Sequence, residues 1–143
     1  MIEKTFGVKD SKYRYYDRIG AYLIAVQNNS LAVVRTPKGY FLPGGKIEEQ
    51  ESHMECIKRE CLEEIGYSVT VSDYICSGET YLIHPTIGHF HPIQFYYSGK
   101  ILEYVKKPVE QDHNFEWISC DEIGGKFVLK QQEWAVKKYL SVY

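Results

Sequence analysis

One long helix between glycine-rich ends constrains the fold of this chain most. Residues 52–65 are good helix formers without glycine or proline, and Gly66 follows where a helix C-terminus favours glycine. Upstream, Pro43-Gly44-Gly45 predicts a turn at which the backbone approaches other groups closely. Strand-like segments lie on both sides of this unit. The sequence therefore predicts an α/β or α+β fold, with a mixed β-sheet and helices packed on it.

The remaining elements follow from apolar patterns and turn signals. Residues 17–27 and 31–34 are rich in apolar residues, and Asn28-Asn29-Ser30 between them predicts a hairpin. Further predicted elements are strands at 40–42, 67–71, 74–83, 92–102 and 115–119, a loop at 108–114 and a helix at 130–140. The chain has 143 residues without a repeat or linker, so we expect a single domain over residues 1–143.

Charge and composition exclude several classes of partner. Seventeen Lys and Arg against nineteen Asp and Glu give a net charge of −2. No overall positive field therefore draws the protein to a nucleic-acid polymer or an anionic membrane. The apolar stretches are far shorter than the about 20 residues of a spanning helix. The N-terminus lacks the basic start and apolar run of a secretory signal, so we expect a cytoplasmic protein. Without CxxC spacing, the cysteines are expected to be reduced: Cys56, Cys61, Cys76 and Cys120.

Three glutamates share one face of the predicted helix. At about 100° per residue, Glu60, Glu63 and Glu64 fall within a sector about 100° wide. Like charges four residues apart and acids near a helix C-terminus both destabilise a helix. A divalent cation would remove these penalties, and carboxylate ligands suit Mg²⁺ or Mn²⁺ better than Zn²⁺. Taken alone, the cluster is also compatible with a solvated face screened by Lys58 and Arg59.

The spacing of the residues around this cluster decides between the two interpretations. The segment 45–67 matches the Nudix box, Gx(5)Ex(7)REUxEExGU with U apolar, and every fixed position is filled: Gly45, Glu51, Arg59, Glu60, Glu63, Glu64 and Gly66. The apolar positions are filled by Cys61 and Tyr67, which are mild departures. The chain thus resembles a MutT-like Nudix hydrolase. Phe41-Leu42-Pro43-Gly44 and Glu116-Trp117-Ile118 also look like this family, the latter in a strand near the nucleotide site.

The resemblance implies a Nudix-type α/β/α sandwich that carries a loop-helix-loop. It implies Mg²⁺- or Mn²⁺-dependent hydrolysis of a diphosphate bond in a nucleoside di- or triphosphate, or in a nucleoside diphosphate linked to another moiety X. The implied catalytic and metal-binding residues are Glu60, Glu63 and Glu64, with the backbone carbonyl of Gly44 as a further ligand. The general base stays open between Glu60 and a loop carboxylate. Glu110 in the predicted loop is either an additional ligand or a surface residue.

The other box residues have supporting roles in this interpretation. An ion pair between Glu51 and Arg59 would hold the loop against the helix, and Gly45 and Gly66 shape its two ends. The alternative function is a Nudix-fold module that binds a nucleotide without cleaving it. Such a module is expected to lose box carboxylates or the arginine, and here none is missing.

Residues outside the box give predictions about the substrate. Tyr40 and Phe41 directly precede the glycine turn, and aromatic rings stack on bases. Residues 84–92 contain proline and glycine and predict a loop, which is either a connection between strands or a lid over the substrate; its histidines are His84, His89 and His91. Their spacing is not that of a zinc site. The Tyr13-Arg14-Tyr15-Tyr16 cluster either covers a pocket or contacts a second copy in a homodimer.

Overall fold

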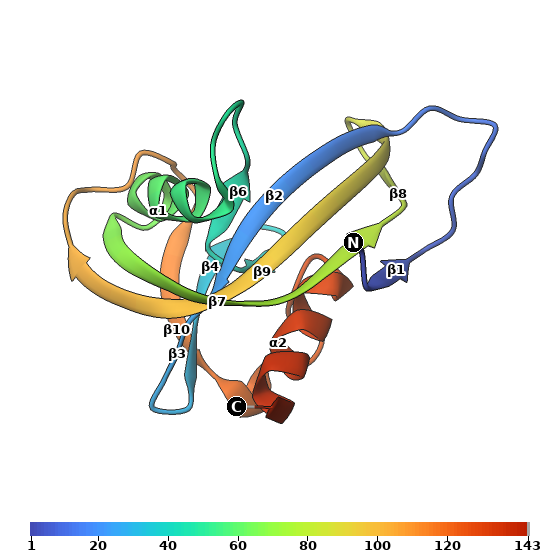
Figure 1. Ribbon diagram of the computed structural model, residues 1–143. Coiled ribbons are helices and arrows are strands. Elements are labelled where there is room, and N and C mark those ends of the chain that lie inside the picture. Colours follow the sequence, from blue (N-terminus) through green and yellow to red (C-terminus); the bar gives the residue numbers. More distant parts are fainter. Residues whose placement is uncertain (143) are drawn as a thin grey trace.

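The computed structural model describes residues 1–142, and within them two β-sheets and two α-helices form layers (Figure 1). The larger sheet has the order β1-β7-β9-β2-β6, with β8 paired to β9. Its strands are β1 (Lys4–Phe6), β2 (Tyr16–Ile24), β6 (Gly44–Lys46), β7 (Tyr67–Thr80), β8 (Leu82–His84) and β9 (Gly88–Tyr104). This sheet is mixed, as predicted, because β1 runs parallel to β7 and β2 parallel to β9.

The smaller sheet is antiparallel and has the order β10-β4-β3, with β5 paired to β4. Its strands are β3 (Val26–Gln27), β4 (Ser30–Thr36), β5 (Gly39–Phe41) and β10 (Asn114–Ser119). The helices are α1 (His53–Glu64) and α2 (Lys130–Val142), and a 3₁₀ turn, η1 (Cys120–Glu122), follows β10. None of the helices within residues 1–142 has the length and apolar character needed to cross a membrane.

The two helices lie on opposite sides of the long strands β2, β7 and β9 (Figure 1). Alternation along β2 explains this arrangement, because successive side chains of a strand point to opposite faces. Tyr22 and Ile24 belong to the core cluster that contains α2 residues. Ala21 and Leu23 belong to the cluster that contains the buried face of α1. The result is the α/β/α sandwich that the sequence predicts.

The predicted hairpin of residues 17–27 and 31–34 forms only at its tip. β3 and β4 pair across the two-residue turn Asn28-Asn29, whose φ angles of 51° and 59° suit asparagine. β2, however, ends at Ile24 and pairs with β6 and β9 in the other sheet. Because both sheets bury apolar side chains, the sequence pattern does not change where the chain passes from one to the other at Ala25.

The predicted loop at 84–92 is wrong, because most of this segment is a β-hairpin. β8 reaches His84 and β9 starts at Gly88, so only residues 85–87 form the turn. The Nδ1 atom of His84 accepts the backbone N–H groups of Thr86 and Ile87, both at 3.2 Å. The histidine thus stabilises the turn that its proline and glycine neighbours allow, and the flanking residues are free to pair as strands.

Local signals position α1 as expected. Ser52 caps the helix: its Oγ accepts the Glu55 N–H at 3.1 Å, and the Glu55 carboxylate accepts the Ser52 N–H at 2.9 Å. At the other end Gly66 has a φ of 78°, a left-handed conformation that favours glycine. Its N–H donates to the Cys61 carbonyl at 3.0 Å. The buried face of α1 packs on the sheet, so the neighbouring face with the glutamates turns towards β6.

Candidate active site

Arg59 connects the loop before α1 to the helix. Its Nε and Nη2 atoms donate to the two carboxylate oxygens of Glu51 at 2.6 and 2.9 Å, and Nη2 also donates to the Lys46 carbonyl at 3.0 Å. The Arg59 hydrogen bonds are the main reason that the pKa of Glu51 is lowered to about 2. The Nη1 atom lies 3.3 Å from a Glu60 carboxylate oxygen and 3.5 Å from one of Glu63. One guanidinium therefore holds the loop and faces two helix carboxylates.

The glycines of β6 let two α1 carboxylates lie against the edge of the sheet. The Gly44 N–H donates to Oε1 of Glu64 at 3.2 Å. At Gly45 the fit is closer, because a Cβ atom there would overlap the Glu60 carboxylate. A side chain at position 45 would therefore displace Glu60, so the glycine is required by packing.

Burial makes the ionised forms of these two carboxylates costly. The side chains of Glu60 and Glu64 are only 14% and 10% exposed. Desolvation raises the pKa of Glu60 to about 7; Arg59 opposes this, and the nearby carboxylates add to it. Desolvation also raises the pKa of Glu64, against hydrogen bonds from His113 and the Gly44 N–H. Desolvation outweighs the favourable contacts of both acids, so a cation would stabilise their ionised forms.

His113, which the sequence analysis did not single out, joins the carboxylate cluster. Its Nδ1 atom lies 3.1 Å from Oε2 of Glu64 and 2.7 Å from Oε2 of Glu110. The hydrogen bond with Glu64 is the main cause of the raised pKa of His113. One ligand atom from each of Glu64, Glu110 and His113 lies within 4.8 Å of the others. Glu110 is thus brought to the box glutamates. For His113 the only sequence signal is its place three residues after Glu110, a spacing that is common in loops.

A cavity of about 670 Å³ opens beside this cluster, on the α2 side of the larger sheet. Its acidic end is lined by Glu60, Glu64, Glu110 and His113. Most of the remaining wall is apolar and includes Phe41, Leu82, Ile87, Phe90, Val128 and Leu129. Arg18 and Lys38 add positive charge to the lining. An acidic end, an apolar wall and nearby cations together suit a ligand that combines a polyanion with a ring.

The predicted site residues divide between this cavity and other surroundings. Gly44 and Gly45 line the cavity with Glu60, whereas Glu63 does not and has a side chain that is 39% exposed beside Arg59. Glu51 in the loop pairs with Arg59 on α1, and Gly66 follows the C-terminus of this helix. The structure thus brings Glu60, Glu64 and Glu110 together and leaves Glu63 at the margin.

The proposed substrate contacts divide according to strand alternation. Phe41 and His84 line the cavity. Tyr40, next to Phe41 on β5, points elsewhere and donates its hydroxyl to Glu116 at 3.1 Å. Two histidines of β9 also lie outside the cavity lining, because Phe90 and Pro92 are the residues that face it: His89 stacks on Tyr13, and His91 lies between Asp17 and Glu79.

The N-terminal tyrosine cluster packs within the chain. The rings of Tyr13 and His89 are stacked with centroids 4.0 Å apart, and Tyr15 meets Tyr81 and His89 edge to face at 5.2 Å. These residues therefore cover the outer side of the β8-β9 hairpin. Tyr13 is still about half exposed, so a contact with a second copy remains a prediction.

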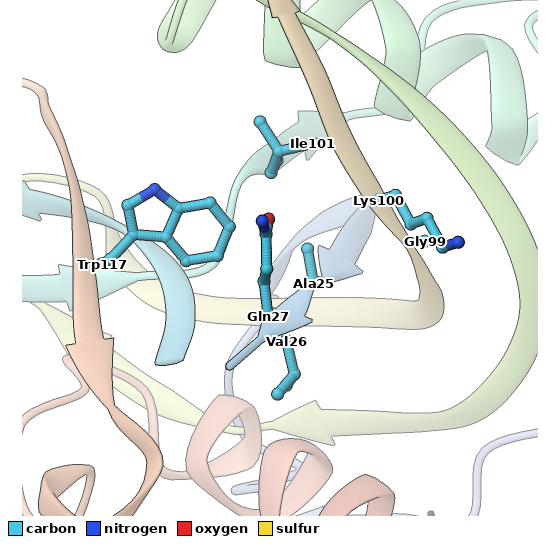
Figure 2. Close-up of a pocket in the computed structure, with 7 residues that line it drawn as sticks. All are labelled: Ala25, Val26, Gln27, Gly99, Lys100, Ile101 and Trp117. Carbon is cyan, nitrogen blue, oxygen red and sulfur yellow. The ribbon is translucent and has the colours of Figure 1, made fainter. Parts of the chain in front are cut away.

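A second, smaller cavity of about 320 Å³ lies away from the acidic cluster (Figure 2). In Figure 2 the Trp117 ring and the Gln27 amide flank it, with Ile101 above them. Its seven lining residues include no carboxylate and no histidine, and Lys100 is the one charged residue among them. Trp117, which the sequence analysis placed in a strand near the nucleotide site, lines this cavity rather than the larger one.

The NUDIX domain family model matches residues 15–141. No curated protein matches the sequence. A NUDIX hydrolase from Nitrosomonas europaea superimposes with a TM-score of 0.73 at 20% identity, over 89% of this chain and 90% of the other.

Two further structures have the same fold. A MutT NUDIX hydrolase from Burkholderia pseudomallei has a TM-score of 0.65 at 20% identity, with 86% and 98% of the two chains covered. An ADP-ribose pyrophosphatase from Streptococcus suis has a TM-score of 0.66 at 16% identity, with 87% and 90% covered. At these identities the likeness concerns the fold, whereas the family model covers most of the sequence, including the segment that forms the acidic cluster. The chain therefore belongs to the NUDIX domain family.

Proposed function

We propose that the protein hydrolyses a diphosphate bond in a nucleoside di- or triphosphate, or in a nucleoside diphosphate linked to another moiety, with Mg²⁺ or Mn²⁺ as cofactor. The observation that supports this most is the pair of carboxylates formed by the buried Glu64 and the largely buried Glu60, at one end of a cavity whose size suits a nucleotide. Among proteins of similar fold, the names ADP-ribose pyrophosphatase and UDP-X diphosphatase both describe cleavage of a diphosphate.

The donor set fits a hard divalent cation. Glu60, Glu64 and Glu110 offer carboxylate oxygens at the acidic end, and we assign the Gly44 carbonyl and Glu63 as further ligands. His113 holds Glu64 and Glu110 together by hydrogen bonds. When bound, the cation neutralises charge on the diphosphate and lowers the pKa of a coordinated water.

The protein's own residues position the reactants. Arg59 and Glu51 fix the loop, so the carboxylates of α1 stay directed at the cavity. Arg18 and Lys38 line the cavity, and their positive charges would attract the phosphates. The geometry offers two acceptors for the proton of the attacking water: Glu60, whose pKa is raised to about 7, and Glu110, which contacts His113.

A hydrolysis panel tests the proposal. The purified protein is incubated with Mg²⁺ and dNTPs, nucleoside diphosphate sugars or dinucleotides, and products are separated by anion-exchange chromatography. We expect cleavage of the diphosphate in at least one class and its loss in Glu60→Gln. Binding of these compounds without any product would instead support the alternative, a module that holds a nucleotide without turnover. Light scattering of the same sample tests whether the chain forms a homodimer.

A further inference from the structure

One side of the cavity is formed by a buried amide that the proposed chemistry does not use. Gln94 on β9 lines the cavity and is only 3% exposed. It belongs to a network of buried polar side chains between β9 and α2, together with Tyr96, Gln131 and Gln132. A buried amide in the apolar part of the cavity wall requires a hydrogen-bond partner for each of its polar atoms.

Backbone groups fix the orientation of this amide. The Leu42 N–H can only donate, and it lies 2.8 Å from Gln132, so the atom of Gln132 that it meets is the carbonyl oxygen, Oε1. The other end of that side chain is then Nε2, which donates to Gln94 at 2.9 Å. The atom of Gln94 that receives this bond is therefore its oxygen. The assignment follows from a main-chain donor and does not depend on the choice of amide flip.

A second set of contacts surrounds the same oxygen of Gln94. Nε2 of Gln131 donates to the Pro92 carbonyl at 3.1 Å, so its oxygen faces the Tyr96 hydroxyl at 3.1 Å. That hydroxyl also lies 2.7 Å from the oxygen of Gln94. The Tyr96 proton is thus shared between two acceptors, and Oε1 of Gln94 receives donors from Tyr96 and Gln132.

This arrangement leaves the Nε2 group of Gln94 directed at the cavity. Within residues 1–142 it donates to no protein group. No fully buried side-chain nitrogen or oxygen in the same residues lacks a partner, so this nitrogen is accessible, and the accessible space beside Gln94 is the cavity. A rigidly held N–H₂ donor therefore lies among the apolar residues that include Phe41 and Phe90.

We propose that Gln94 determines specificity by donating a hydrogen bond to a ring carbonyl of the substrate, so that the enzyme selects nucleotides whose base carries an oxo group at this position. This inference rests on the proposed function, since the acidic end is taken to hold the diphosphate. An exocyclic amine would place a second donor against Nε2, and a ring without either group would leave Nε2 desolvated and unpaired. Both cases lose affinity relative to the oxo base.

The test removes the hydrogen-bond donor from the protein and, separately, the oxo group from the substrate. Inosine triphosphate is compared with purine riboside triphosphate, which lacks the 6-oxo group. Uridine triphosphate is compared with the triphosphate of 2-pyrimidinone riboside, which lacks the 4-oxo group. For the wild-type protein we expect kcat/KM to favour the oxo substrate by at least about tenfold in one pair. Gln94→Met keeps the length and removes the donor, so the preference should fall to within about twofold, a coupling of at least fivefold.

A matched control separates the donor from the network. Gln131→Met removes an amide of the same buried cluster that does not line the cavity, so it should lower the melting temperature but keep the substrate ratio. If Gln94→Met melts below the assay temperature, Gln94→Asn replaces it, because it keeps an amide and withdraws the donor by one methylene.

The outcomes separate the two proposals. Three results would each overturn the role of Gln94. The wild-type protein could show no preference for the oxo substrate in either pair. The ratio of kcat/KM values could be equal in the wild type and Gln94→Met, or the preference could be lost in Gln131→Met. If none of these triphosphates is hydrolysed, the same cycle is measured as Kd by calorimetry with the corresponding monophosphates, and the proposed function fails only if the whole hydrolysis panel gives no product. A fivefold coupling in Kd would then still support recognition by Gln94, and its absence would overturn it.

Discussion

Gly45 and Glu60 are packed so closely that a methyl group on the α-carbon of Gly45 would occupy the position of the Glu60 carboxylate. The strand β6 and the helix α1 therefore meet at a point where one residue has no side chain and the other brings a buried acid. This contact fixes how deeply Glu60 enters the cavity.

The first prediction follows from this contact. Gly45→Ala should displace Glu60 and lower activity about a hundredfold, the order of loss that a misplacement of about 1 Å causes. Its melting temperature should fall as well. Gly124→Ala is the matched control, because a Cβ atom there meets nothing within 4 Å, and it should keep both properties. Full activity of Gly45→Ala in a steady-state assay would show that the position of Glu60 is not critical.

The second prediction concerns the cation. Because desolvation destabilises the ionised forms of Glu60 and Glu64, activity should vanish with EDTA and return with Mg²⁺ or Mn²⁺. Mg²⁺ should also raise the melting temperature by mass action, by an amount that corresponds to about 2.7 kcal/mol at a hundredfold excess over Kd. The rise should be absent in a Glu60→Gln, Glu64→Gln double variant. Undiminished turnover in a sample shown to be metal-free would contradict the proposed cofactor.

The third prediction separates chemistry from stability at Glu64. Gln keeps the shape and an oxygen for the Gly44 N–H, and it removes a charge that burial disfavours. We expect Glu64→Gln to lose about 10³-fold in kcat, as other deletions of a reacting charge do. Without metal it should melt no lower than the wild type. Glu103→Gln, at an exposed position of β9, serves as the control and should stay active.

The fourth prediction is a pH dependence of stability. The pKa of Glu51 is lowered to about 2 by Arg59, so its ionised form stabilises the folded state above the unfolded pKa of about 4.5. Glu51→Gln should therefore be less stable than the wild type at pH 7. The difference should shrink as the pH falls from about 4.5 towards 2, because Glu51 is then protonated. Thermal melts of both proteins across this range provide the measurement, and a difference that does not change with pH would argue against the ion pair.

The fifth prediction compares two adjacent aromatic residues. Phe41 lines the cavity, whereas the Tyr40 hydroxyl binds Glu116 on the other face of β5. Phe41→Ala should change the order of preferred substrates by about tenfold in kcat/KM. Tyr40→Phe should leave this order unchanged and lower the melting temperature only slightly, because the lost hydrogen bond is only partly buried. The reverse result would mean that the strand presents its other face to the substrate.

The parts of the molecule that the sequence predicted well depend on neighbouring residues. The helix at 52–65 is observed as His53–Glu64 because its capping box and its terminal glycine lie within the segment itself. The proximity of Glu60 and Glu64 follows from helix periodicity, and the contact between Glu51 and Arg59 follows from motif spacing. These features need no knowledge of the tertiary fold.

The features that were missed depend on distant parts of the chain. β2 and β3 belong to different sheets because β2 pairs with β9, which lies about 70 residues later in the chain. Which of Phe41 and Tyr40 is directed at the cavity depends on the register between β4 and β5. His113 and Gln94 acquire their surroundings only when α1 and α2 are in place, so no local pattern marks either residue as part of the cavity wall.

Four consecutive residues, 42–45, connect the two ends of the cavity. The Leu42 N–H orients Gln132, which in turn orients Gln94, while Gly44 and Gly45 hold Glu64 and Glu60. The amide and the carboxylates thus depend on the same short stretch of backbone. A change that shifts this stretch is therefore expected to alter both ends of the cavity together.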